Sequence, residues 1–208
     1  MGLISFSISV FTGLIAMINP IANIPVFLGL VNSYPQEKKS HLACKACVVA
    51  FVILVFFILL GKFIFSIFGI TIPAFKITGG ILIFKIGFDM LSSKPSPEKH
   101  MEHKGEPDDS IAISPLAIPL LAGPGAIVTA MDSISDTTFI HLLIVVVISA
   151  LVLFINYISL RSGDVISKRL GHNVIEVLNK LMGLILAIMG TGMIISGLQL
   201  LLPKVFAN

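Results

Sequence analysis

The sequence predicts an all-α membrane protein with six transmembrane helices, arranged as a 3+3 inverted-topology repeat, and three observations predict it. First, 56% of the 208 residues are hydrophobic and only 12% are charged, whereas soluble domains carry about a quarter charged residues. Second, the apolar residues form blocks close to the roughly 20 residues that an α-helix needs to cross a bilayer. Third, two blocks are interrupted by prolines in matching patterns. An ordinary soluble domain is therefore excluded.

Six apolar blocks are the expected membrane spans. In chain order they cover residues 3–31, 42–68, 72–92, 111–132, 138–160 and 177–201. The first has no basic segment before it and no convincing cleavage site, so we expect a retained helix rather than a signal peptide. The segment Gly69–Pro73 supplies the turn signal between the second and third blocks. Residues 1–92 then form the first three-helix repeat and 111–208 the second, joined by a charged loop at 93–110.

Positive charge predicts the orientation, because connections rich in Lys and Arg stay in the cytoplasm. Ten such residues lie in or beside the first, third and fifth connections, and three lie on the opposite side. The ten are Lys38, Lys39, Lys45, Lys94, Lys99, Lys104, Arg161, Lys168, Arg169 and Lys180, and the three are Lys62, Lys76 and Lys204. We therefore expect the odd connections in the cytoplasm and both termini outside, on the periplasmic side of a bacterium.

The first and fourth blocks share a proline pattern that is unusual inside a membrane span. The first reads Asn-Pro-Ile-Ala-Asn-Ile-Pro from Asn19 to Pro25, and the fourth reads Ser-Pro-Leu-Ala-Ile-Pro from Ser114 to Pro119, an offset of 95 or 94 residues. Each proline removes a backbone donor, and the freed carbonyls persist in a membrane only where protein buries them or they line a wet cavity. Two halves of three spans each must enter the membrane from opposite sides. The pattern therefore predicts an inverted repeat with interrupted first and fourth helices and one shared cavity.

Two glycine pairs give a weaker match between the third and sixth blocks. Gly80 and Gly87 recur as Gly183 and Gly190, an offset of 103 residues. Seven residues span about two helical turns, so each pair lies on one helix face. We expect these faces to pack closely against other helices rather than to contact a ligand.

At these motifs the sequence resembles the MarC family of bacterial and archaeal inner-membrane proteins, within the LysE transporter superfamily. The matching stretches are Asn-Pro-Ile-Ala-Asn-Ile-Pro-Val-Phe from Asn19, Thr-Gly-Gly-Ile-Leu from Thr78, Pro-Leu-Ala-Ile-Pro from Pro115 and Ala-Gly-Pro-Gly-Ala from Ala122. The resemblance covers essentially the whole chain. It implies a multipass inner-membrane protein, and one branch of the family resembles a transporter of small neutral amino acids. Members typically have Asp where this chain has Asn19 and Gly where it has Ala22, so this chain has an amide in place of a carboxylate.

The candidate substrate site comprises the polar and helix-breaking residues of both proline clusters. Asn19 and Asn23 lie four residues apart, so their amides share a helix face and could bind a carboxylate or an ammonium group. Carbonyls freed before the prolines could hold a cation, while a restarting helix N-terminus favours an anion. Ser114 is the expected repeat partner of Asn19. The predicted site residues are Asn19, Pro20, Asn23, Pro25, Ser114, Pro115, Pro119, Gly123, Pro124 and Gly125.

The remaining polar residues within the spans have structural interpretations beside functional ones. Lys85 and Asp89 lie four residues apart, and we expect their side chains to form an ion pair with each other near the cytoplasmic interface. If they lie deep in the membrane instead, Asp89 is the candidate for proton coupling, with Lys85 beside it. Asn156 either joins helices or reaches the cavity. Cys44 and Cys47 begin a predicted span without a second cysteine pair, so we expect no redox or zinc site. No metal and no cofactor is expected.

The sequence therefore predicts an alternating-access carrier in a bacterial inner membrane, and not an enzyme. The expected cargo is a small polar solute, by resemblance a neutral amino acid, with export favoured and H⁺ or Na⁺ as a candidate coupling ion. A passive channel could also line a pore with interrupted helices, and an adaptor without transport activity would dock through the loop at 93–110. The expected partners are the lipid bilayer and the solute. The net charge of +3, without a basic stripe, predicts no nucleic-acid binding, and the oligomeric state stays open.

Overall fold

The computed structural model describes residues 2–31, 34–92, 113–134, 139–163 and 172–205. The regular structure within these ranges is entirely helical. The predicted cytoplasmic loop at 93–110 lies outside the described residues. The all-α prediction is therefore confirmed for the described part of the chain.

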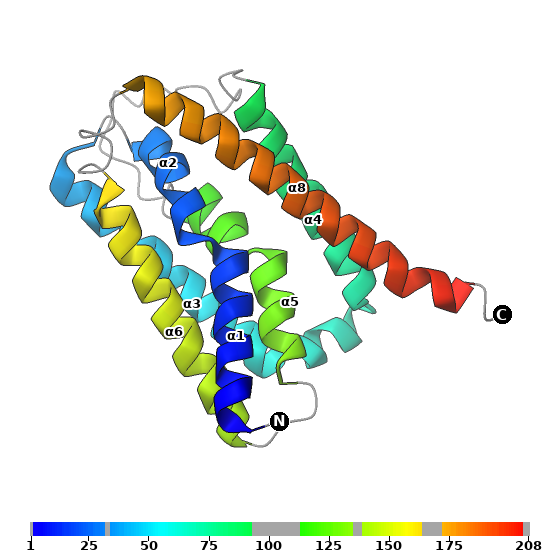
Figure 1. Ribbon diagram of the computed structural model, residues 1–208. Coiled ribbons are helices and arrows are strands. Elements are labelled where there is room, and N and C mark those ends of the chain that lie inside the picture. The colour runs from blue at the N-terminus through cyan, green and yellow to red at the C-terminus, as the bar shows by residue number, and fades with distance from the viewer. Residues whose placement is uncertain (1, 32–33, 93–112, 135–138, 164–171, 206–208) are drawn as a thin grey trace.

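The described helices form a bundle of long and short elements (Figure 1). In chain order they are α1 (Leu3–Ile18), α2 (Pro20–Val31), α3 (Gln36–Ile67), α4 (Ile72–Leu91), the π-helix η2 (Ile113–Leu121), α5 (Pro124–Asp132), α6 (Phe139–Arg161) and α8 (His172–Val205). The predicted turn between α3 and α4 is present. Gly69 has a φ of 61°, which glycine adopts without strain, and the Thr71 hydroxyl caps α4 by accepting from the Ala74 N–H at 3.3 Å.

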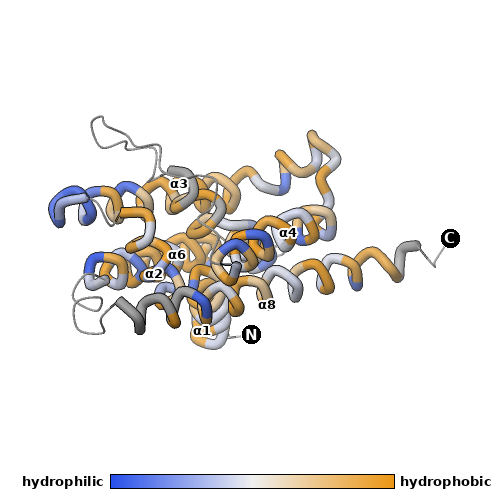
Figure 2. Tube along the Cα trace, turned by 90° about the horizontal axis from the view of Figure 1, so that it is seen from above, coloured by the Kyte–Doolittle hydropathy of each residue, from blue (hydrophilic) through white to orange (hydrophobic). Residues whose placement is uncertain are grey.

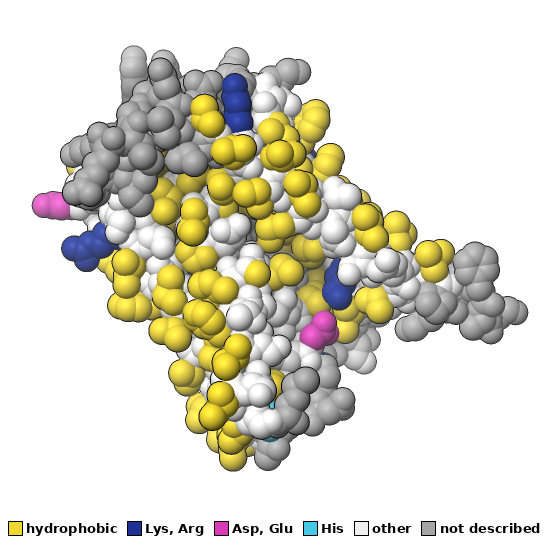
Figure 3. All heavy atoms as spheres, viewed as in Figure 1, with side chains coloured by type: hydrophobic (Ala, Val, Ile, Leu, Met, Phe, Trp, Pro, Cys, Tyr) yellow, Lys and Arg dark blue, Asp and Glu magenta, His cyan; other side chains and the backbone are white. Residues whose placement is uncertain are grey.

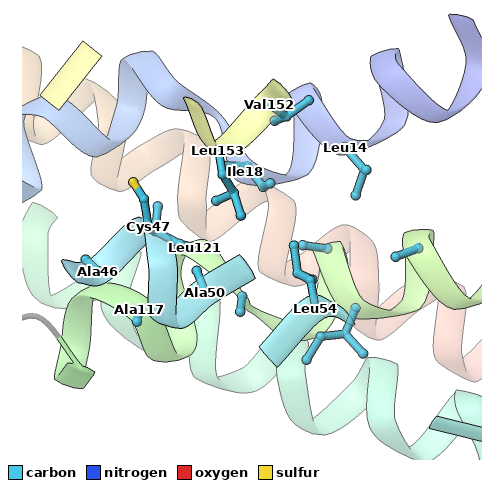
Figure 4. Packing of buried hydrophobic residues seen from close by; sticks show 14 of the residues in the cluster. Leu14, Ile18, Ala46, Cys47, Ala50, Leu54, Ala117, Leu121, Val152 and Leu153 are labelled. Carbon is cyan, nitrogen blue, oxygen red and sulfur yellow. The ribbon is translucent and has the colours of Figure 1, made fainter. Parts of the chain in front are cut away.

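Six of these elements share one hydrophobic core, and we call them the core bundle: α1, α2, α3, η2, α5 and α6. Figure 4 shows how Ile18 of α1, Leu54 of α3, Leu121 of η2 and Leu153 of α6 come together in it. The core includes many alanines, which let these helices approach one another closely, as is typical of helix packing in membranes.

The other two long helices, α4 and α8, lie side by side along one edge of the molecule (Figure 1). They run antiparallel, because Gly80 lies against Gly190 while Gly87 lies against Gly183. A Cβ atom on Gly80 would lie 2.5 Å from the Gly190 carbonyl oxygen, and one on Gly87 would lie 2.5 Å from the Gly183 oxygen. Side chains at these positions would force the helices apart. The predicted close packing at Gly80 and Gly87 and at Gly183 and Gly190 is confirmed. From here on, the name glycine pair refers to the two helices α4 and α8 together.

Large hydrophobic side chains cover the outside of the long helices. Phe63 of α3 is 65% exposed, Phe154 of α6 is 58% exposed and Ile188 of α8 is 61% exposed. Figure 2 shows hydrophobic residues along the helices, and Figure 3 shows few charged side chains on the visible face. Water would disfavour so much exposed apolar surface, whereas the hydrocarbon chains of a bilayer match it.

Four described segments are long and apolar enough to cross a membrane, and they match predicted blocks one, two, five and six. They are Leu3–Val31, Gln36–Ile67, Phe139–Arg161 and Lys180–Leu202. Block three is the 20-residue helix α4, whose apolar sequence is interrupted by Lys76, Lys85 and Asp89. Block four is divided into η2 and α5, of nine residues each. Nine residues rise roughly 14 Å, about half of the hydrocarbon core, so neither half crosses alone.

Candidate functional site

The first membrane segment is broken at Asn19, where α1 ends and α2 begins. Asn19 has φ 46° and ψ 72°, a left-handed conformation that asparagine tolerates better than most residues with a Cβ atom. Pro20 explains the break, because it has no N–H to donate and its ring disfavours helical geometry at the preceding residue. The predicted interruption at this position is confirmed.

Asn19 satisfies backbone groups on both sides of the break. Its N–H donates to the Ile15 carbonyl at 2.9 Å, and its carbonyl accepts from the Asn23 N–H at 3.2 Å. Its side-chain Oδ1 accepts from the Ala22 N–H at 3.2 Å, which caps the N-terminus of α2. The Asn19 Nδ2 group donates to no other described residue. One donor group at the break is therefore left for a ligand or water.

A second break separates η2 from α5. The Ala122 N–H donates to the Ala117 carbonyl at 2.9 Å, five residues earlier, as in a π-helix. Gly123 is then extended (φ −73°, ψ 167°), and α5 starts at Pro124. Proline suits the first turn of a helix because its missing N–H would have no partner there.

The second break does not lie where the alignment of the two proline clusters would put it. Ser114 and Pro115 lie inside η2, whereas Asn19 lies between two helices, so Ser114 and Asn19 occupy different places relative to their breaks. Helix α5 begins at Pro124, directly after Gly123, just as α2 begins at Pro20, directly after Asn19. The π-helix contains the earlier prolines without ending at them, and a sequence motif alone does not reveal this.

A small internal cavity lies beside Asn19, between the core bundle and the glycine pair. Its volume is about 20 Å³, enough for about one water molecule. The core bundle contributes Met17, Ile18, Asn19, Asn23 and Leu120, and the glycine pair contributes Ile83, Ile86, Leu186 and Met189. The walls are apolar except for the two asparagines, and none of these lining side chains is ionisable. Such a site fits a neutral or zwitterionic ligand, because an unpaired charge would lack compensation.

A buried chain of hydrogen bonds holds Asn23. Its Nδ2 group donates to the Ile18 carbonyl at 2.7 Å and to Oδ1 of Asn156 in α6 at 2.9 Å. The Asn156 Nδ2 group donates in turn to the sulfur of Cys47 in α3 at 3.6 Å. Asn23 is 2% exposed and Asn156 is fully buried. The chain thus links α2, α6 and α3 at the level of the break.

Asn156 does not line the cavity, although the sequence left that role open. It contacts the site through Asn23, from which it is separated by 133 positions. The signal available in the sequence was only that an asparagine inside a membrane span needs a partner. Which partner it takes depends on the packing of α2 against α6.

The Gly-Pro-Gly segment packs against neighbouring helices. Pro124 contacts Gly79 of α4 directly, where a Cβ atom would collide with the proline ring. A Cβ atom on Gly125 would lie 2.9 Å from the sulfur of Met17. These residues bring α5 close to α4 and α1, and none of the three residues of the segment lines the cavity.

Of the ten predicted site residues, Asn19 and Asn23 line the cavity. Pro20 and Pro25 are buried within α2 and shape its path. The structure describes only the backbone of Ser114, Pro115 and Pro119, all within η2.

Lys85 and Asp89 lie on α4 and do not line the cavity. Lys85 is exposed and Asp89 is half-buried. These two described residues form no ion pair with each other in this structure, so the predicted bridge between them is not formed.

The cysteines and other metal-ligating groups lie apart from the cavity. Within the described ranges, no three His, Cys, Asp or Glu side chains come together in a geometry that could hold a metal ion. Cys44 is exposed and Cys47 is buried, and both are free thiols.

Comparisons with known proteins match the chain over nearly its full length. A model of the MarC family of integral membrane proteins matches residues 4–202. The membrane protein YvbG of Bacillus subtilis is 38% identical over 204 residues, which is 96% of this chain and 97% of YvbG. A membrane protein of Pyrococcus horikoshii is 40% identical over 190 residues, covering 91% and 92% of the two chains. The inner membrane protein MarC of Escherichia coli is 35% identical over 199 residues, covering 89% and 90%. No solved structure matches.

Proposed function

The chain belongs to the MarC family of integral membrane proteins, and from this premise we propose that it is an alternating-access carrier for small neutral amino acids or similar polar metabolites. One observation carries the proposal: a cavity with two asparagines lies where a broken helix meets a second pair of helices. Secondary carriers bind their solutes at interrupted helices of this kind. The proposed location is a bacterial inner membrane, and the protein would perform transport rather than enzymatic catalysis.

The proposal includes an inverted repeat of two three-span halves, 1–92 and 111–208. Six of the nine residues that line the cavity form pairs at a constant offset of 103 positions. The pairs are Met17 with Leu120, Ile83 with Leu186, and Ile86 with Met189. Helices α3 and α6 start at the same offset, at Gln36 and Phe139. A two-fold axis through the cavity would relate these pairs.

The contacts between helices support the same repeat. Helix α1 packs against α6 as η2 packs against α3, and α2 packs against α6 as α5 packs against α3. Likewise, α2 packs against α8 as α5 packs against α4. Exchanging the two halves also turns the contact of Gly80 with Gly190 into that of Gly183 with Gly87. Six spans follow if α4 crosses the membrane and η2 crosses together with α5.

The small volume of the cavity supports a carrier over an open pore. Room for about one water cannot hold an amino acid, so binding requires one wall to move. The glycine pair takes one helix from each half, and its backbones are in close contact. We therefore expect α4 and α8 to move together against the core bundle, opening the cavity to one side and then to the other.

The asparagines define the chemistry of the proposed ligand. Asn19 offers a free Nδ2 donor, and Asn23 uses both of its N–H groups within the protein, which leaves its oxygen as an acceptor. A donor beside an acceptor matches the carboxylate and the ammonium of one amino acid. The N-terminus of α2 adds to the attraction for the carboxylate. Export and coupling to H⁺ or Na⁺ are the expected mode, and Asp89 remains the candidate for a coupling proton.

Exchange in liposomes tests the proposal. We expect purified protein, reconstituted with internal neutral amino acids, to exchange external labelled alanine, glycine or serine in a saturable manner. Asn19→Gly should abolish exchange, because glycine keeps the left-handed backbone but removes the amide. Thr12→Val is the matched control, since the Thr12 hydroxyl is exposed and bonds only to carbonyls of α1.

Other outcomes would identify the two rival functions. Conductance without counterflow would indicate a passive channel. Correct insertion with no exchange of any amino acid would overturn the substrate assignment. It would favour an adaptor, which would tolerate Asn19→Gly and depend on the loop at 93–110.

A further inference from the structure

The amide of Asn23 can adopt only one orientation in this structure. One of its contacts, the Ile18 carbonyl at 2.7 Å, is an oxygen that only accepts. The atom facing it must therefore be the amide nitrogen and not the oxygen. The second N–H of the same nitrogen donates to Oδ1 of Asn156 at 2.9 Å. Both donors of Asn23 are thereby used inside the protein.

The remaining polar atom of Asn23 is its Oδ1, which accepts from no residue that the structure describes. Asn23 is 2% exposed and lines the cavity. Its Oδ1 is not among the fully enclosed side-chain atoms that lack a partner in the described part of the chain. The oxygen is therefore open to accept from an N–H or O–H group of a ligand that enters the cavity.

Asn156 is the second partner, beside the Ile18 carbonyl, that holds the Asn23 amide in this orientation. Asn156 is fully buried in α6, and its own amide is held because its Nδ2 group donates to the Cys47 sulfur while its Oδ1 accepts from Asn23. If Asn156 were apolar, one N–H of Asn23 would lose its partner. The Ile18 carbonyl alone would then hold the amide, so the acceptor would be presented to the cavity less rigidly and beside an unpaired N–H.

We propose that Asn156 is a positioning residue that fixes the Asn23 oxygen toward the cavity, so that the site selects ligands with an ammonium group. The inference rests on the proposed carrier function and specifies which end of the solute is recognised there. An α-amino acid satisfies the Asn23 oxygen with its ammonium. The corresponding α-hydroxy acid has a single weaker O–H donor and no positive charge to offer.

Competition between alanine and lactate tests the proposal in reconstituted protein. Wild-type protein should exchange alanine, and lactate should compete poorly. Asn156→Leu, which has similar volume, should reduce the preference for alanine over lactate by about tenfold, roughly the effect of one hydrogen bond to a charged group. Asn156→Asp keeps an oxygen that accepts from Asn23 and should retain the preference.

Ser149→Ala is the matched control on the same helix. Ser149 is also fully buried in α6, but its hydroxyl bonds only to the Val145 carbonyl of its own helix at 2.8 Å. A merely structural effect of Asn156→Leu would lower alanine and lactate transport equally, as a defect at Ser149 would, and that result would overturn the proposal. Efficient lactate exchange by the wild type would overturn it too, while leaving the carrier function intact. Absence of all exchange by the wild type would instead show that the proposed function itself is wrong.

Discussion

Asn19 stabilises the break in the first membrane segment through three separate groups of a single residue. Its N–H completes α1, its carbonyl starts α2, and its side-chain oxygen caps α2. In lipid each of the backbone partners would cost several kcal/mol if left unpaired. An aspartate could cap in the same way, so the amide changes the charge of the site without removing the cap.

Replacing Asn19 separates backbone strain from the loss of the amide. Asn19→Ala should lower the free energy of unfolding by about 1–2 kcal/mol more than Asn19→Gly, because alanine is strained at a φ of 46° and glycine is not. Unfolding by SDS titration in mixed micelles would measure the difference. Equal destabilisation by the two variants would contradict the left-handed conformation of Asn19.

The sequence predicts those site residues whose role follows from their neighbours in the chain, and not those whose role depends on helix packing. Asn19 and Asn23 were predictable because polar residues beside prolines in a membrane span point to a broken helix. Asn156 was not, since its partner is set by the packing of α2 against α6. The sequence paired Ser114 with Asn19 because both proline clusters look alike, while in the structure Ser114 lies within the π-helix and the second break lies at Gly123.

At the scale of elements, the contact between α4 and α8 depends on the absence of side chains. Gly87→Ala should lower the free energy of unfolding by about 1–3 kcal/mol, because the new Cβ atom would lie 2.5 Å from backbone atoms of Gly183 and Ala187. The same measurement in mixed micelles would detect the change.

Gly192→Ala is the matched control on α8. A Cβ atom there would meet nothing within 4 Å, so the substitution should be neutral or stabilising by about 0.4–1 kcal/mol. If Gly87→Ala and Gly192→Ala changed the free energy of unfolding equally, the missing side chain at Gly87 would not be responsible for the close approach of α4 and α8.

The sequence predicts a helix well where the length of an apolar block determines its ends. It predicts less well where local backbone geometry breaks the helix. The four described segments that are long and apolar enough to cross a membrane follow from hydropathy alone. The division of block four into two nine-residue helices required the three-dimensional arrangement, because its apolar residues continue through the break. The glycine contact was predicted as a packing face, but its partner helix was not.

At the scale of the whole molecule, the asymmetry of Lys and Arg predicts the orientation in the membrane. In a variant carrying Cys44→Ser, a cysteine at Ser96 should react with an impermeant maleimide only from the cytoplasmic side. A cysteine at Ser135, in the connection before α6, should react only from the outside. If the impermeant maleimide labelled Ser96→Cys in intact cells, the loop would lie outside and the predicted orientation would be wrong.

The two polar residues of the cavity come from one part of the chain only, and for a carrier such as the one proposed this would affect the direction of transport. The apolar walls come from both 1–92 and 111–208, but both asparagines come from 1–92. A symmetric dimer of identical units would present the same polar corner twice and would hold a solute equally well in either of two opposed poses. A carrier with a single polar corner would hold its solute in one pose relative to the bilayer normal, so the solute would leave with a different end first on each side. The energy barriers to release on the two sides would then not have to be equal.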